Sequence, residues 1–346
     1  MTRCRCVLIV GILASLFVAC GQPADRPRRQ EEERPKIGLL MDTLEEERWQ
    51  RDRDLILERA KEARADVLVE SAERDDDRQL AQAQSMLEQG VQALVVVPHS
   101  ADAAGRIVEV ARARGVPVIA YDRLIRNAGV DLYISYDNRK VGEMQAQYLR
   151  NRAPEGNYIL IGGAKTDHNA VLIREGQRAA LEDAVKRGAI RIVADPFTPD
   201  WRADAAAELT EAALKKAGNK VAAIVASNDN TAAGAIAVLE KHGLAGKVLV
   251  SGQDANLDAV RRIVQGTQTM TVYKPLRSLA RLAAHSAVQM AQGHTVEGTS
   301  TIDDGKQQVQ ALLLNPIIVD KGLVDQVIIG DKFHTREDVY GAGGGK

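Results

Sequence analysis

Short apolar runs alternate with helical periods along this chain from Lys36 onward. The first runs cover residues 37–41, 66–70, 93–97 and 117–120. Between them, residues 52–64 and 77–89 place apolar side chains three and four positions apart, which predicts helices. Continuous runs of Val, Ile and Leu that alternate with helices are typical of a parallel sheet covered on both faces.

The same series then restarts in the second half of the chain. Residues 158–161, 190–193, 222–225 and 247–250 have the pattern of further strands, each followed by a helix. A second set of βα units predicts an α/β protein with two doubly wound, parallel-sheet lobes. Ligands of such sheets bind outside the carboxyl ends of the strands, so the residues that follow each strand matter most.

The predicted strand ends are followed by polar and aromatic residues. Both tryptophans of the chain, Trp49 and Trp201, fall in predicted strand-to-helix loops, one in each lobe, and both have charged neighbours. An indole among polar groups suits a ligand that has an apolar face and hydroxyls, such as a sugar. The alternative is that each ring packs on neighbouring side-chain stems near a helix start. The other residues at these strand ends include Asp42, Arg48, Asp122, Arg123, Asp167, Asn169, Asn228, Asp229 and Asp254.

These side chains have the donors and acceptors that a polyol needs. Carboxylates accept hydrogen bonds from hydroxyls, guanidinium groups donate them, and asparagine does both. Because Asp also caps helices, each carboxylate has a structural alternative. We expect Asp229, directly before a helical stretch, to be such a cap, and Asp122 and Asp254 to contact the ligand.

The amino terminus has the pattern of an export signal. Arg3 and Arg5 precede an apolar run, residues 7–19, that is too short to span a bilayer. The run ends before Cys20 in a sequence that resembles the cleavage box of bacterial lipoproteins. We therefore expect a lipoprotein signal peptide at 1–19, lipidation at Cys20 and a disordered tether at 20–35, the alternative being an ordinary signal peptide.

Composition narrows the function further. Lys and Arg total 46 against 47 Asp and Glu, which gives no electrostatic case for nucleic-acid binding. A lipidated Cys20 leaves no free thiol, and the six histidines lack metal-ligand spacing, so neither a cofactor nor a metal is expected. The motifs of serine hydrolases, zinc proteases and P-loop proteins are absent from the sequence. A glycosidase that uses Asp122 and Asp254 stays a minor alternative.

Several longer motifs resemble one family, the periplasmic sugar-binding proteins that serve ABC importers. The resemblance extends from about Lys36 to about residue 338. Two of its motifs, ERWQ and TVYKP, resemble the xylose branch in particular. The motifs lie at residues 47–54 (ERWQRDRD), 120–123 (AYDR), 133–138 (YISYDN), 226–229 (ASND), 251–255 (SGQDA) and 266–275 (GTQTMTVYKP).

The resemblance implies a type I periplasmic binding protein that closes two lobes over D-xylose without catalysis. It implies crossovers near Asp137, Lys274 and Asn315, with a first lobe at 36–136 plus 275–314 and a second at 137–274 plus 315–338. A flexible tail is expected at 339–346. The implied partners are an ABC permease and ATPase, and the protein is expected to be a monomer outside the cytoplasm, attached to the membrane only by its lipid. Alternatives are a binder of ribose, arabinose or a signalling furanose, or a sensor that feeds a receptor. The implied sugar contacts are Arg48, Asp122, Arg123, Asp167, Asn169, Asn228, Asp254 and Lys274, with Trp49 and Trp201 stacking on the two faces of the ring.

Overall fold

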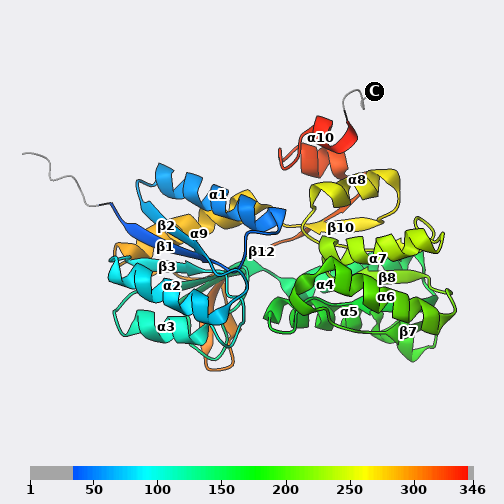
Figure 1. Cartoon of the computed structure of the whole chain (residues 1–346), viewed down its shortest axis with the longest axis horizontal. Coiled ribbons are helices and arrows are strands. Elements are labelled where there is room, and N and C mark those ends of the chain that lie inside the picture. The colour runs from blue at the N-terminus through cyan, green and yellow to red at the C-terminus, as the bar shows by residue number, and fades with distance from the viewer. Residues whose placement is uncertain (1–33, 342–346) are drawn as a thin grey trace, which may run out of the picture. The chain divides into compact units, whose positions relative to one another are not determined.

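A seven-stranded sheet forms the first lobe of the protein, whose computed structural model describes residues 34–341 (Figure 1). These residues belong to one compact unit. The strand order is β11-β12-β5-β4-β3-β1-β2, and only the β11–β12 pair is antiparallel. The strands are β1 (Lys36–Met41), β2 (Asp66–Ser71), β3 (Ala93–Val96), β4 (Val118–Tyr121), β5 (Leu132–Tyr136), β11 (Ser300–Asp303) and β12 (Gln308–Leu314).

Helices cover both faces of this sheet, as the continuous apolar runs predicted. Figure 1 shows α1 (Glu47–Glu62) and α9 (Leu276–Ala291) on one side, and α2 (Asp76–Glu88) and α3 (Gly105–Arg112) on the other. Successive residues of β1 point to opposite faces. Leu39 packs in the core beneath α1 and α9, whereas Leu40 packs in the core beneath α2 and α3.

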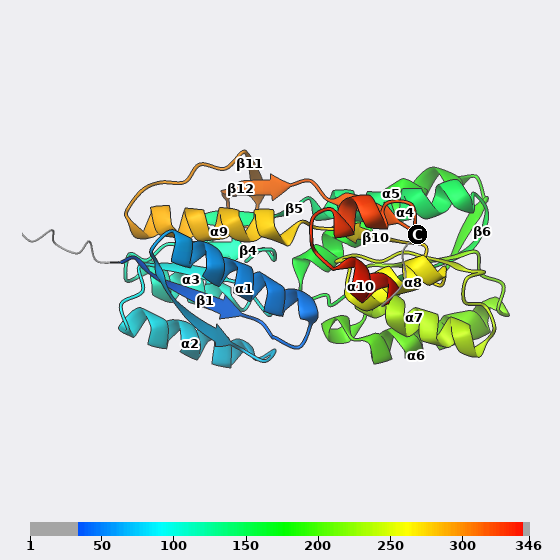
Figure 2. The same ribbon diagram turned by 90° about the horizontal axis from the view of Figure 1, so that it is seen from above.

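The second lobe repeats this plan on a smaller parallel sheet with the order β7-β6-β8-β9. Figure 2 shows α4 and α5 on one side of this lobe and α6 and α7 on the other. Leu160 of β6 packs in a core with α4 and α5, and Ile161 packs in a core with α6 and α7. The strands are β6 (Gly156–Ile161), β7 (Ile190–Ala194), β8 (Ala223–Ala226) and β9 (Leu249–Val250). The helices are α4 (Asn138–Arg152), α5 (His168–Lys186), the 3-10 turn η1 (Pro199–Trp201), α6 (Ala203–Ala217), α7 (Asp229–Lys241) and α8 (Leu257–Gln265).

Helices α4 and α5 approach each other closely because each contributes a glycine to their contact. A Cβ atom on Gly142 would collide with the backbone carbonyl of Ile173, and one on Gly176 would collide with the carbonyl of Arg139. Any larger residue at either position would force the helices apart. The close packing fixes α5, whose amino-terminal end carries two of the predicted site residues.

An antiparallel ribbon of β10 (Met270–Tyr273) and β13 (Ile317–Asp320) completes the fold. The chain passes between the two lobes after β5, after β10 and between β12 and β13, near the expected crossovers at Asp137, Lys274 and Asn315. Two further elements, η2 (Val324–Ile329) and α10 (Arg336–Tyr340), follow the ribbon.

The expectation of a flexible tail from residue 339 is wrong for its first residues. Helix α10 continues through Tyr340, and the Val339 side chain is buried in a core shared with Val319 and Ile328. Apolar burial therefore holds this segment on the domain. The expected signal peptide, the expected lipidation site Cys20 and the expected tether up to residue 33 lie outside the described residues, as do residues 342–346.

Candidate functional site

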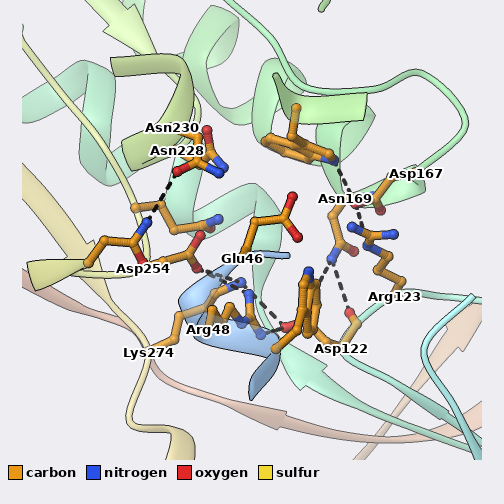
Figure 3. Close-up of a pocket in the computed structure, with 14 residues that line it drawn as sticks. Glu46, Arg48, Asp122, Arg123, Asp167, Asn169, Asn228, Asn230, Asp254 and Lys274 are labelled. Atoms are coloured by element: carbon orange, nitrogen blue, oxygen red, sulfur yellow. Dashed lines mark hydrogen bonds and ion pairs between the residues drawn. The ribbon is translucent and has the colours of Figure 1, made fainter. Parts of the chain in front are cut away.

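All ten residues predicted to contact a ligand line one pocket (Figure 3). The space between these residues measures about 470 Å³, a volume that includes space open to solvent. Its lining contains the predicted Arg48, Trp49, Asp122, Arg123, Asp167, Asn169, Trp201, Asn228, Asp254 and Lys274. It also contains four residues that were not predicted from the sequence, namely Glu46, Asn230, Gln253 and Asn256.

The lining residues come from segments that follow strands, as expected for parallel sheets. Asp122 and Arg123 come directly after β4, and Lys274 comes directly after β10. Trp49 corrects one expectation, because α1 begins at Glu47 instead of near residue 52 and the ring therefore lies in the first turn of a helix. The charged residues at 45–48 obscured this start, since they interrupt the apolar period that marks a helix in sequence.

Two of the carboxylates are held by unusual backbone conformations. Asp122 has φ 59° and Asp254 has φ 95°, in the region that non-glycine residues rarely adopt. Such strain persists only where the surrounding structure enforces it, and it is concentrated at ligand and active sites. Both carboxylates accept from the guanidinium group of Arg48.

Arg48 is the centre of a buried cluster of charges. Its guanidinium group donates to Asp122, to Asp52 at 3.2 Å and to Asp254 at 3.1 Å. The Lys274 ammonium lies 3.4 Å from Asp122 and 3.9 Å from Asp254. Burial by itself would raise the pKa of Asp122, but Arg48 and Lys274 outweigh it, so that this carboxyl titrates below its ordinary range. Burial dominates at Asp52 and raises its pKa to about 6.

Arg123 organises a second cluster. One of its nitrogens donates to Asp42 at 2.6 Å and to the Pro98 carbonyl at 3.1 Å, and its Nε lies 2.9 Å from Asp167. Asp167 also accepts from the Asn169 backbone N–H at the start of α5 and from Trp201 Nε1 at 3.2 Å. Burial raises the pKa of Asp167, and Arg123 opposes that shift. The carboxylate thus fixes the Trp201 ring from the edge.

The two indoles are more buried than their charged neighbours in the sequence suggested. Trp49 is 5% exposed and Trp201 is 8% exposed, and each also packs against the core of its own lobe. The guanidinium groups of Arg48 and Arg123 lie 4.5 and 5.1 Å from the Trp49 ring centre, within cation–π range. Trp201 has φ 58°, a strained value for a bulky residue, and its ring lies against Gly163.

Polar groups of the two lobes contact each other across the pocket. Arg48 reaches Asp254, and Arg123 reaches Asp167. Asn169 Nδ2 donates to the backbone carbonyl of Asp122 at 3.0 Å and to its carboxylate at 3.2 Å. A ligand with several hydroxyls can both donate to these carboxylates and accept from these cations, so it can replace the direct contacts one for one.

Asp229 has a different role from the expected helix cap. Asn228 is the N-cap of α7, with its side chain accepting from the Thr231 backbone N–H. The fully buried Asp229 carboxylate instead accepts from Gln268 at 2.8 Å and from Thr271. Burial, reinforced by the nearby Asp254 charge, raises its pKa to about 7. Partners 39 and 42 residues away in sequence decided this role, which local capping preference could not reveal.

Within residues 34–341 no group of three or more His, Cys, Asp and Glu side chains has a metal-binding arrangement. No helix of the described part is long and apolar enough to cross a membrane.

Comparison with known proteins decides the family. The sequence model of a family described as "Periplasmic binding protein domain" matches residues 37–295. This chain belongs to that family. It is 45% identical to the D-xylose-binding periplasmic protein of Haemophilus influenzae and 43% identical to that of Escherichia coli K12, in each case over 88% of this chain and 92% of the relative.

A solved structure supports the same assignment. The carbohydrate transporter solute binding protein of Chloroflexus aurantiacus, in complex with D-glucose, superposes with a TM-score of 0.82 and 29% identity, over 87% of this chain and 97% of that one. The predicted type I periplasmic binding protein fold is thereby confirmed. Membership of a family of binding proteins also confirms the expectation that the chain is not an enzyme.

Proposed function

We propose that this protein captures D-xylose between its two lobes outside the cytoplasm and delivers it to an ABC importer. One observation carries the proposal: the pocket combines one indole from each lobe with a perimeter of paired cations, carboxylates and amides. Aromatic rings suit the apolar faces of a pyranose, and the perimeter suits its hydroxyls. A phosphate or carboxylate would add negative charge to a pocket that Asp122, Asp167 and Asp254 already line.

The relatives support D-xylose over other sugars. Two proteins above 40% identity are both named for D-xylose binding, and the match covers nearly the whole described domain. We propose Arg48, Asp122, Arg123, Asp167, Asn169, Asn228, Asp254 and Lys274 as the hydrogen-bonding residues, with Trp49 and Trp201 as the stacking rings.

Closure of the lobes would complete the site. Because Trp49 and Trp201 belong to different lobes, neither lobe alone provides both walls of the slot. An open form would take up the sugar, and the closed form would dock on the permease. The proposed lobes are 36–136 plus 275–314 and 137–274 plus 315–338. The proposal includes lipid attachment at Cys20 as the means of retention at the membrane.

Isothermal titration calorimetry of the purified domain with xylose, ribose, arabinose and glucose tests the sugar. A pentose has about ten non-hydrogen atoms, so at roughly 0.8 kcal/mol per atom we expect a Kd near micromolar for xylose. Tighter binding of any other sugar in the panel would refute the assignment to xylose. Failure of all four would refute sugar binding of this class.

Lipidation is tested separately in cells that express the full chain. Metabolic labelling with a palmitate analogue should mark the native chain, and Cys20→Ser should abolish the label. A label that persists in Cys20→Ser would contradict attachment at this residue.

A further inference from the structure

Glu46 faces the pocket with one carboxylate oxygen that has no partner among the described residues. Its Oε1 accepts from Arg74 at 3.1 Å, whereas its Oε2 is inaccessible to solvent and makes no hydrogen bond there. The side chain as a whole is 18% exposed. Figure 3 shows the carboxylate directed into the space between the labelled polar residues. Buried carboxylate oxygens are rarely left in this state, because losing hydration without a replacement donor costs free energy.

Local structure provides no donor for Oε2 of this carboxylate. Glu46 is the N-cap residue of α1, yet its side chain makes no capping hydrogen bond. Burial raises the pKa of Glu46, while Arg123 and Arg74 oppose that shift, so the environment penalises the charge that the side chain carries. A donor that arrives with the ligand would remove this penalty.

The position of Glu46 differs from that of the charged clusters around Arg48 and Arg123. Together with Trp201, Asn230 and Asn256, Glu46 lines both the central pocket and a larger, more open cavity beside it. Glu46 therefore lies where the central pocket leads into the outer cavity. A group of the ligand that points toward this boundary meets Oε2 of Glu46, an acceptor that has no hydrogen-bond donor among the described residues.

We propose that Glu46 accepts a hydrogen bond from one ligand hydroxyl and thereby determines which sugars bind. The inference rests on the proposed sugar-binding function and adds to it a contact outside the set that the sequence motifs supplied. A carboxylate can only accept, so it selects for a hydroxyl at that position and against a hydrogen, a methyl group or an anion.

The test pairs each variant with ligands that lack single hydroxyls. Glu46→Gln, Glu46→Leu and the native domain are titrated calorimetrically with D-xylose and with its 1-, 2-, 3- and 4-deoxy analogues. Glu45→Gln is the matched control, because Glu45 pairs with the same Arg74 at 2.6 Å but does not line the central pocket. Circular dichroism and thermal unfolding check that each variant is folded, and the near-isosteric Glu46→Gln serves if Glu46→Leu is not.

We expect Glu46→Leu to weaken xylose binding about 10- to 100-fold, as for the loss of a hydrogen bond to a charged group. Glu46→Gln should weaken it less, because the amide oxygen still accepts. One deoxy analogue lacks the hydroxyl that would donate to Glu46, so the native domain should already bind this analogue more weakly than xylose. For this analogue, Glu46→Leu should weaken binding by less than about a further twofold. Glu45→Gln should bind xylose as the native domain does.

The outcomes distinguish failure of the proposed Glu46 contact from failure of the proposed sugar-binding function. If Glu46→Leu and Glu46→Gln both bind xylose as tightly as the native domain does, Glu46 makes no hydrogen bond to the sugar. If Glu46→Leu weakens all five ligands by the same factor, Glu46 only supports the structure, and the inference is overturned. If the native domain binds no sugar, the proposed function falls and this inference falls with it.

Discussion

Gly163 gives the sharpest test of the stacking geometry. It follows β6, and a Cβ at this position would lie 2.3 Å from Cδ2, Cε2 and Cε3 of the Trp201 indole. Carbon atoms in contact stay about 3.5 Å apart or more, so Gly163→Ala requires the ring to move by about 1 Å. The backbone at Gly163 is outside the positive-φ region, so alanine adds bulk there without conformational strain.

If the Trp201 ring moves away from Gly163, it must either narrow the space for the sugar between the two indoles or tilt away from the sugar. An aromatic contact contributes on the order of 1 kcal/mol, and a misplaced wall also weakens hydrogen bonds that contribute about 1 kcal/mol each. We therefore expect xylose to bind roughly 10- to 100-fold more weakly to Gly163→Ala, as measured by calorimetry. Tryptophan fluorescence of the same variant in a Trp49→Phe background reports on the Trp201 ring itself, because Trp201 is then the only tryptophan.

Gly105→Ala is the matched control for this substitution. A Cβ on Gly105 would lie 3.6 Å from the Ala128 Cβ, an ordinary contact remote from the pocket, so binding should not change. Native affinity in Gly163→Ala, together with unchanged Trp201 emission and an unchanged response to xylose, would refute the reasoning. Loss of affinity in both glycine variants would point to a general effect on the fold.

Three further substitutions test the site and its supports. Trp49→Ala should weaken xylose binding in calorimetry at least tenfold and also lower the unfolding temperature, because the ring packs in the first core. Arg48→Ala should cost about 3–5 kcal/mol in urea unfolding, since it leaves buried carboxylates without their cation; an unchanged midpoint would contradict this. Asp229, with a pKa raised from 3.8 to about 7 by burial, holds its proton more tightly in the folded state, so stability should fall as pH rises across that window. Asp229→Asn should make that fall shallower in urea unfolding measured from pH 4 to 7, and equal slopes would argue against it.

Much of the fold could be predicted because burial on both faces of a parallel sheet leaves a strong local pattern. The run at 37–41 became β1, with Leu39 and Leu40 buried on opposite faces. Strand ends were less certain, and the run predicted at 247–250 contributes only Leu249–Val250 to the sheet. Pairing with β8 decides where this strand begins, and a single segment does not contain that information.

The errors arose where distant contacts outweighed local preference. Asp229 looked like a cap, but Gln268 and Thr271 reach its carboxylate from another segment. Val339 looked like the start of a tail, but a core formed by the ribbon and η2 buries it. Glu46 was not singled out in the sequence because nothing nearby indicates that one of its oxygens lacks a donor.

The sequence by itself determined the two series of βα units and the polar residues that end their strands. Both follow from the spacing of apolar side chains and from chain connectivity, which are properties of a few neighbouring residues. Only the tertiary structure decided which charges neutralise one another, such as Arg48 with Asp122 and Asp254, 74 and 206 residues away. Coulombic and hydrogen-bond energies depend on separations of a few ångströms and on the exclusion of water. Both the separations between these charges and the exclusion of water from them depend on how the chain crosses between the two lobes.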